Sequence, residues 1–174
     1  REVPFPNPLG EARVQLRLLG TKVDFWTEKA GRPKFLSSNN ATIITKLLTT
    51  ANLIKVVTAL LLERQVLLVS SSLAILTPAA EALRQLIFPF EIVTAYIPML
   101  PEFLTDVVGA PIGFVIGVHE SIYTKLIELG DILNDDVVIV NLDKNTVDTK
   151  VIIPSLPAHR LSKLTSCIND NVSD

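Results

Sequence analysis

A run of three serines follows an apolar stretch of the chain, where a nucleophile or a phosphate-binding loop could lie. The apolar residues from Gln65 to Val69 predict a buried strand, and Ser70 to Ser72 come directly after it. In an open α/β sheet, binding sites lie at this end of the strands. The run contains no glycine and no lysine follows it, so the serines are better explained as the start of a helix. A catalytic or phosphate-binding serine stays the less favoured alternative.

Few other side chains could perform chemistry. The sequence has two histidines, His119 and His159, without further ligands at the spacing typical of metal sites. A single cysteine, Cys167, excludes a cysteine-rich zinc site and fits a reducing compartment. The Gly-x-Ser-x-Gly motif of α/β-hydrolases is absent from the sequence. We therefore expect no catalytic acid, base or nucleophile, no metal and no cofactor.

Glycine recurs at every fourth position at Gly109, Gly113 and Gly117. This spacing is typical of packed membrane helices, but Pro111 and the short length of the apolar run argue against a spanning helix. A phosphate-binding Walker loop would need a lysine directly after its last glycine. We expect instead that these glycines allow tight turns and a close approach to neighbouring backbone.

The span 89–118 contains no Lys or Arg, but three acidic residues, four aromatic residues and four prolines. Pro98 and Pro101 fix loop positions directly after a predicted strand, where α/β sheets place binding sites. Glu102 and Asp106 lie four residues apart on a predicted short helix, a spacing that could pair two carboxylates but more often marks a solvated face. The span is therefore predicted to combine core residues with a docking surface.

Hydrophobic periodicity predicts strands and helices in alternation. Strands are expected at 13–18, near 23–26, and at 65–70, 92–97, 115–118 and 137–140. Helices are expected from 41 to a break near Thr49 and Thr50, from there to about residue 64, from Thr77 to 88, and at 121–129. This order of elements predicts an α/β fold with a largely parallel central sheet covered by helices on both faces.

Thr77 and Pro78 are expected to begin the third of these helices, because a cap residue followed by proline is typical of a first turn. Its buried face is predicted to consist of Ala79, Ala82, Leu83, Leu86 and Ile87. On the two earlier helices the residues predicted to face inward are Ile44, Leu47, Leu48, Ala51, Leu53, Val56, Val57, Leu60 and Leu61.

The composition fits one domain with a substantial core. Hydrophobic residues make up 48% of the chain, with a mean hydropathy of +0.42, yet no run reaches the ~18 apolar residues that a membrane span needs. The net charge is −2. Residues 1–64 hold ten Lys/Arg against five Asp/Glu, whereas 65–174 hold six against thirteen. This asymmetry could orient the domain toward a charged partner, although ordinary solvated faces are the simpler interpretation.

Four motifs, in this order, resemble the central module of DENN domains, the family whose members act on Rab GTPases. They are the strand before Ser70, the helix closing on Phe88-Pro89-Phe90, the block at 96–101 and the glycine-containing block at 109–117. The resemblance implies a proline-rich linker from a preceding module at 1–12 and a central module at 13–160. Residues 161–174 would be a polar tail or the start of a following helical module. Because the chain begins at Arg1 and not at methionine, we expect it to be a piece of a longer protein.

The resemblance implies guanine nucleotide exchange on a Rab-type small GTPase in membrane trafficking. The implied partners are that GTPase, the flanking longin-like and helical DENN modules, and a DENN-like protein as dimer partner, without nucleic acid. The implied location is the cytoplasm, with at most peripheral attachment to vesicle membranes. In the acidic span and just after it, we expect Tyr96 and Phe103 as anchors of the docking surface, with Glu102, Asp106 and Glu120 at its rim.

Two alternatives remain. The first is a non-catalytic DENN-like scaffold in a tethering or GTPase-regulating complex, and the second is a small-ligand α/β enzyme whose catalytic residues lie outside this sequence. The sequence also departs from many family members after Pro89-Phe90, where Glu91-Ile92 stands in place of a tryptophan.

Overall fold

The computed structural model describes residues 12–18, 21–27, 39–130 and 134–172, which belong to two compact units, Arg1–Phe35 and Leu36–Asp174. In the first unit, β1 (Ala12–Leu18) and β2 (Thr21–Thr27) pair as an antiparallel hairpin with Val14 opposite Phe25. The strand predicted at 13–18 is confirmed, and the one predicted near 23–26 is longer than expected. Apart from its last residue, the linker predicted at 1–12 lies outside the described residues.

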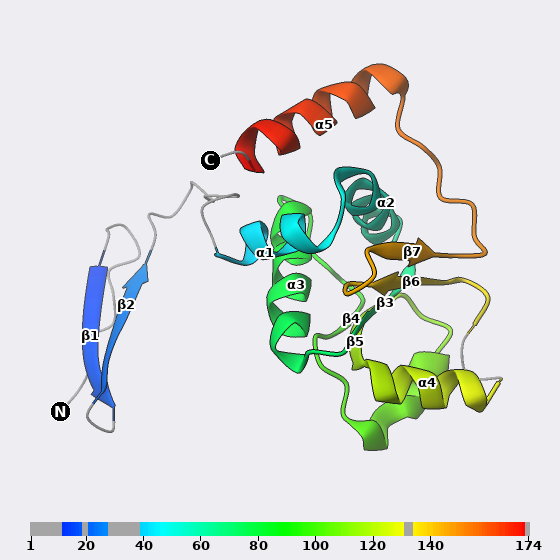
Figure 1. Ribbon diagram of the computed structural model, residues 1–174, viewed down its shortest axis with the longest axis horizontal. Helices are drawn as coiled ribbons and strands as arrows, with labels where there is room; N and C mark the ends of the chain where they lie inside the picture. The colour runs from blue at the N-terminus through cyan, green and yellow to red at the C-terminus, as the bar shows by residue number, and fades with distance from the viewer. Residues whose placement is uncertain (1–11, 19–20, 28–38, 131–133, 173–174) are drawn as a thin grey trace. The chain divides into compact units, whose positions relative to one another are not determined.

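The second unit is built on a five-stranded sheet of order β4-β5-β3-β6-β7 (Figure 1). The strands are β3 (Gln65–Ser70), β4 (Ala95–Ile97), β5 (Phe114–His119), β6 (Val137–Asn141) and β7 (Thr146–Asp148). The first four run parallel, and β7 pairs antiparallel with β6. The central strand β3 is buried along its whole length, as expected for a parallel strand covered on both faces.

Helices cover both faces of this sheet. They are α1 (Asn39–Leu47), α2 (Thr50–Leu61), α3 (Leu73–Leu86), the 3₁₀ helix η1 (Glu102–Gly109), α4 (Glu120–Glu128) and α5 (Ala158–Val172). Val66 and Leu68 of β3 pack in one core cluster with α1, α2 and α3. Leu67 and Val69 pack in a second cluster with α4 and η1. The alternation along β3 therefore separates two cores, and the predicted α/β fold is confirmed.

The start of α3 differs from the prediction. The helix begins at Leu73, so Thr77 is an exposed residue inside it and Pro78 lies in its interior. Proline there cannot donate to the carbonyl four residues earlier. Burial of Leu76 offsets that loss, because the added first turn places this side chain in the core. The predicted face is confirmed, with Ala79, Ala82, Leu83 and Ile87 buried and Leu86 packed against the same cluster.

Other boundaries also differ from the expectations. Strand β4 is limited to 95–97, and Leu61 and Ala51, which were expected to face inward, are exposed. Strand β7 was not predicted. Residues 158–172 form α5, and Ile168 of this helix packs against the core. Whether α5 begins a following helical module stays a prediction.

The break expected near Thr49 and Thr50 is confirmed. The Thr49 hydroxyl accepts a hydrogen bond from the Asn52 amide as the N-cap of α2. Among the helices of the described residues, none combines the length and apolar composition needed to cross a bilayer.

Candidate functional site

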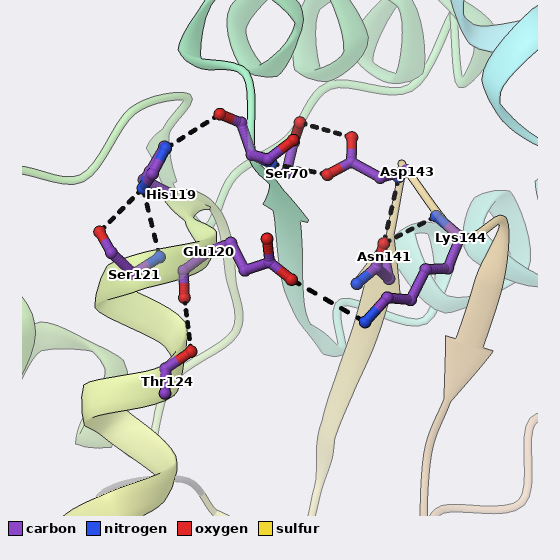
Figure 2. A network of polar contacts seen from close by, with 9 residues as sticks. Ser70, His119, Glu120, Ser121, Thr124, Asn141, Asp143 and Lys144 are labelled. Atoms are coloured by element: carbon purple, nitrogen blue, oxygen red, sulfur yellow. Dashed lines mark hydrogen bonds and ion pairs between the residues drawn. The ribbon is translucent and has the colours of Figure 1, made fainter.

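Polar side chains follow three neighbouring parallel strands at the edge where each strand ends. Ser70 ends β3, His119 ends β5 and Asn141 ends β6, and Figure 2 shows them in one network. The carboxyl edge of an open α/β sheet is the usual place for a binding site. The serine run singled out from the sequence lies here, so its chemistry can be judged from its partners.

Asp143 binds the first two serines from the turn after β6. Its carboxylate accepts hydrogen bonds from the Ser70 hydroxyl at 2.9 Å and from the Ser71 amide at 2.6 Å. Burial raises the pKa of Asp143, but the hydrogen bonds from Ser71 and Ser70 and the nearby charge of Lys144 outweigh it and lower the pKa below its usual value. The Ser70 hydroxyl also accepts a bond from the Ser72 amide at 3.0 Å. Ser70 is fully buried, so its hydroxyl ties together strand ends rather than meeting a substrate.

His119 connects the same serine run to α4. Its Nδ1 caps the helix by accepting from the Ser121 amide at 3.2 Å, with the Ser121 hydroxyl at 2.8 Å. This contact assigns the proton to Nε2, which then donates to the Ser71 carbonyl at 2.9 Å. Ser70, His119 and Asp143 are therefore neighbours, but the histidine does not contact the Ser70 hydroxyl in the order of a catalytic triad.

Two further contacts close the network. The Asn141 side chain accepts hydrogen bonds from the amides of Asp143 and Lys144 and so fixes the turn after β6. Lys144 Nζ lies 3.8 Å from a carboxylate oxygen of Glu120 at the start of α4. Within the described residues, no group of three or more His, Cys, Asp or Glu side chains could hold a metal ion. The network is thus best explained as a polar clasp that joins β3, β5, β6 and α4.

The opposite, amino edge of the parallel strands is held by the side chain of Gln65. Its Nε2 donates to the carbonyls of Ala110 at 2.7 Å and Ile112 at 3.0 Å, and Gln65 itself is buried. A Cβ atom added to Gly113 would collide with the Glu63 carbonyl oxygen and would lie 2.8 Å from Cγ2 of Thr94. The loops before β3, β4 and β5 therefore meet at Gly113, as expected for a glycine that permits close approach of backbone.

The residues predicted as a docking surface do not all lie together. Glu102, Phe103 and Asp106 share η1, and all three are exposed. Glu102 pairs with Lys125 of α4, and this hydrogen bond lowers the pKa of Glu102. Glu120 belongs to the carboxyl edge through its pair with Lys144.

Tyr96 is separated from these residues. Its ring packs against the core cluster of α1 to α3, whereas Val107 and Val108 of η1 belong to the other cluster. Its hydroxyl donates to Glu81 Oε1 of α3 at 2.8 Å, and Arg84 binds the other oxygen of that carboxylate at 2.7 Å. The structure therefore places Glu102, Phe103 and Asp106 on one element, which is interrupted by non-helical backbone at Leu104, and Tyr96 on another.

Sequence reasoning missed Gln65, His119 and Asp143 as the residues that organise the two edges. A signal was present for two of them, because His119 and the Asn141-Leu142-Asp143 segment each follow an apolar strand at the carboxyl edge. Gln65 stands at the start of its strand and gives no such signal, since its bonds are to carbonyls 45 and 47 residues away.

Comparison with known proteins identifies a family and several relatives. The family model described as the DENN (AEX-3) domain matches residues 1–145. The DENN domain and WD repeat-containing protein SCD1 of Arabidopsis thaliana is 35% identical over 117 residues, which cover 67% of this chain and 9% of that protein. DENN domain-containing protein 1C of Mus musculus is 35% identical over 122 residues, which cover 70% of this chain and 15% of that protein. DENN domain-containing protein 1A of Homo sapiens is 32% identical over 130 residues, which cover 70% of this chain and 13% of that protein. The chain thus spans a small part of the length of these relatives.

Proposed function

The chain belongs to the DENN domain family, and from this membership we propose that it takes part in guanine nucleotide exchange on a Rab-type small GTPase. The observation that carries the proposal is the match of the family model over residues 1–145. DENN proteins are known as exchange factors and regulators of Rab GTPases, and the fold of the second unit agrees with the resemblance seen in the sequence.

Exchange makes few chemical demands on the factor. For a GTPase that holds its nucleotide with picomolar affinity, the binding free energy is about −16 kcal/mol. The factor must bind the nucleotide-free conformation more tightly than the loaded one, and linkage then requires that it weaken nucleotide binding by the same ratio. A rigid surface suffices for this, without an acid, a base or a metal. The clasp at the carboxyl edge and the bonds of Gln65 at the amino edge give the second unit such rigidity.

We further propose that η1 contributes to GTPase docking. Phe103 is 82% exposed and is the candidate anchor, while Glu102 and Asp106 offer negative charge to basic residues of the GTPase. Tyr96 and Glu120 are engaged with Glu81 and Lys144, so the docking proposal is based on η1 alone.

Release of a fluorescent guanine nucleotide from a panel of purified Rab-type GTPases tests the proposal. We expect the chain to accelerate release from at least one member by about tenfold or more, within the usual range of coupling between two ligands. A small GTPase from outside the Rab class serves as the control and should show unchanged release. Unchanged release from every Rab-type member, at saturating chain concentration, would contradict an exchange activity.

A non-catalytic scaffold role is the second candidate. It is favoured by the small share, 9–15%, of the three relatives that this chain covers, because the remaining parts could carry the activity. The same panel separates the two functions, since a scaffold would bind a GTPase or a DENN-like partner without accelerating nucleotide release.

A further inference from the structure

The two edges of the parallel sheet differ in what they present to solvent. The carboxyl edge consists of polar groups that bind one another through Ser70, His119 and Asp143. At the amino edge, the loops before β3, β4 and β5 meet at Gly113, whose absent side chain leaves room for the Glu63 carbonyl and the Thr94 side chain.

Each of these three loops exposes a large apolar side chain directly beside the meeting point. Leu62, Val93 and Ile112 immediately precede Glu63, Thr94 and Gly113, and their exposed fractions are 44%, 84% and 56%. Phe90, in the same loop as Val93, is 65% exposed. We call Leu62, Phe90, Val93 and Ile112 the amino-edge patch. Single exposed apolar residues are ordinary, but apolar residues gathered on convergent loops mark interaction surfaces.

Two of the loops that carry the amino-edge patch, those of Ile112 and Leu62, are fixed by hydrogen bonds within the chain. The buried Gln65 side chain binds the carbonyls on both sides of Pro111, which fixes Ile112 against the start of β3. The turn that carries Leu62 is closed by hydrogen bonds from the Leu62 and Glu63 amides back into α2. A pre-organised surface loses little conformational entropy on binding, so more of its contact energy remains as affinity.

Charge around the amino-edge patch limits what can cover it. The loops of this edge carry the acids Glu63, Glu91, Asp135 and Asp136. The bases near them are Arg64 and Lys150, of which Lys150 pairs with Asp135, and residues 88–113 contain no Lys or Arg. A second copy placed patch to patch would bring like charges together, and an anionic membrane would be repelled by the same acids. The occupant that fits is a protein surface with apolar side chains at its centre and Lys or Arg at its rim.

We propose that the amino-edge patch is a docking surface for the Rab-type GTPase, which contacts it with an apolar surface bordered by basic residues. This inference rests on the proposed exchange function and goes beyond it by naming the contact. The C-terminal end of η1 leads into the patch, because η1 ends at Gly109 and the chain continues directly into Ala110 and Ile112, whereas Glu102 and Phe103 lie at its start.

The test measures how tightly the parent chain and three variants bind the Rab-type GTPases of the panel in their nucleotide-free state. The variants are the double substitution Val93→Ser and Ile112→Ser, the single substitution Val93→Ser, and the control Leu73→Ser. Leu73 is 51% exposed and begins α3 after the carboxyl end of β3, so it matches Ile112 in exposure and chemistry and lies away from the amino-edge loops. Thermal melting of each form checks that folding is unchanged.

We expect the double variant to bind the GTPase about tenfold or more weakly and to accelerate nucleotide release correspondingly less, while the Leu73 control matches the parent chain. If the double variant misfolds, the single Val93→Ser variant tests the surface, and we expect it to lose less GTPase affinity than the double variant would. Parent-like binding and exchange by folded patch variants would overturn the docking surface and leave the exchange function standing. A parent chain that neither binds nor accelerates any GTPase of the panel would overturn both proposals.

Discussion

Tyr96 shows how one side chain can satisfy a sequence pattern and still serve another purpose. The pattern placed it on a docking surface, because it lies in a span without basic residues and directly before a proline-containing loop. In the structure its hydroxyl donates to Glu81 of α3, and Arg84 binds the same carboxylate. That partner lies 15 residues earlier in the chain, and strand and helix periodicity carry no information on such a pairing.

Replacement of Tyr96 by phenylalanine is expected to lower the stability of the chain by about 1 kcal/mol at neutral pH, because the Glu81 carboxylate loses a donor. Burial, followed by the hydrogen bond to Glu81, raises the pKa of Tyr96 above its usual value of 10.0. A raised pKa gives stability that is present below pH 10 and is lost as the pH rises further. Urea unfolding of the parent and of Tyr96→Phe between pH 7 and pH 11 should therefore show a difference that narrows above pH 10. A difference that stays constant would contradict this role of the hydroxyl.

Hydrogen-bond partners at the carboxyl edge illustrate the same limit. The sequence places Ser70, His119 and Asn141 at strand ends, so their common location at one edge follows from parallel pairing. It does not decide between a catalytic arrangement and a clasp. That decision depends on which atoms meet, and here the Ser70 hydroxyl meets Asp143 while His119 caps α4.

At the scale of elements, apolar periodicity was a reliable guide where the burial is strong. The buried face of α3 and the strands β3, β5 and β6 follow it closely. It failed at β7, a three-residue strand without full burial, and at α5, whose residues are mostly polar. Both elements depend on tertiary contacts, such as the Thr50 hydroxyl bond to Asn169 of α5.

A charge on the buried face of α3 is expected to destabilise the chain strongly. Leu83 is fully buried in the core cluster shared with α1 and α2, so Leu83→Asp should cost about 3 kcal/mol or more by removing apolar contacts and burying an unpaired carboxylate. Thr77→Ala in the same helix is the matched control. Thr77 is not the cap of α3, so its replacement should leave stability within about 0.5 kcal/mol of the parent. Chemical denaturation of both variants measures the contrast, and a parent-like midpoint for Leu83→Asp would refute the face assignment.

Glycine is expected at positions 117 and 130 for two different physical reasons. A Cβ atom at Gly117 would collide with the Pro98 carbonyl oxygen, whereas at Gly130 it would meet open space at a φ of +76°. Gly117→Ala should therefore cost about 2 kcal/mol or more through overpacking of backbone in the core. Gly130→Ala should cost only about 1 kcal/mol through backbone strain after α4. Equal losses in thermal or urea unfolding would show that β5 can move away from the loop after β4.

At the scale of the whole chain, charge is distributed unequally along the sequence. Residues 1–64 carry ten basic against five acidic side chains, and residues 65–174 carry six against thirteen. Screening limits the reach of such charge to about 8 Å in physiological salt, so the effect on a partner depends on local contact surfaces. The acidic part includes η1 and the amino-edge loops before β4 and β5, whereas the loop before β3 ends the basic part. Basic partner surfaces are therefore the expected match for η1 and for those two loops.

Charge reversal on η1 tests whether this acidic part guides a GTPase to the chain. Asp106 is the better position, because reversal of Glu102 would also repel Lys125. We expect Asp106→Lys to slow nucleotide exchange at low salt, mainly through a lower association rate, and to leave the unfolding midpoint unchanged. The difference from the parent should shrink as salt is raised toward 1 M, where the screening length falls to about 3 Å. An Asp106→Lys chain that exchanges nucleotide as fast as the parent at low salt would exclude η1 as the guiding surface. The basic amino-terminal part would then be the better candidate for partner contact.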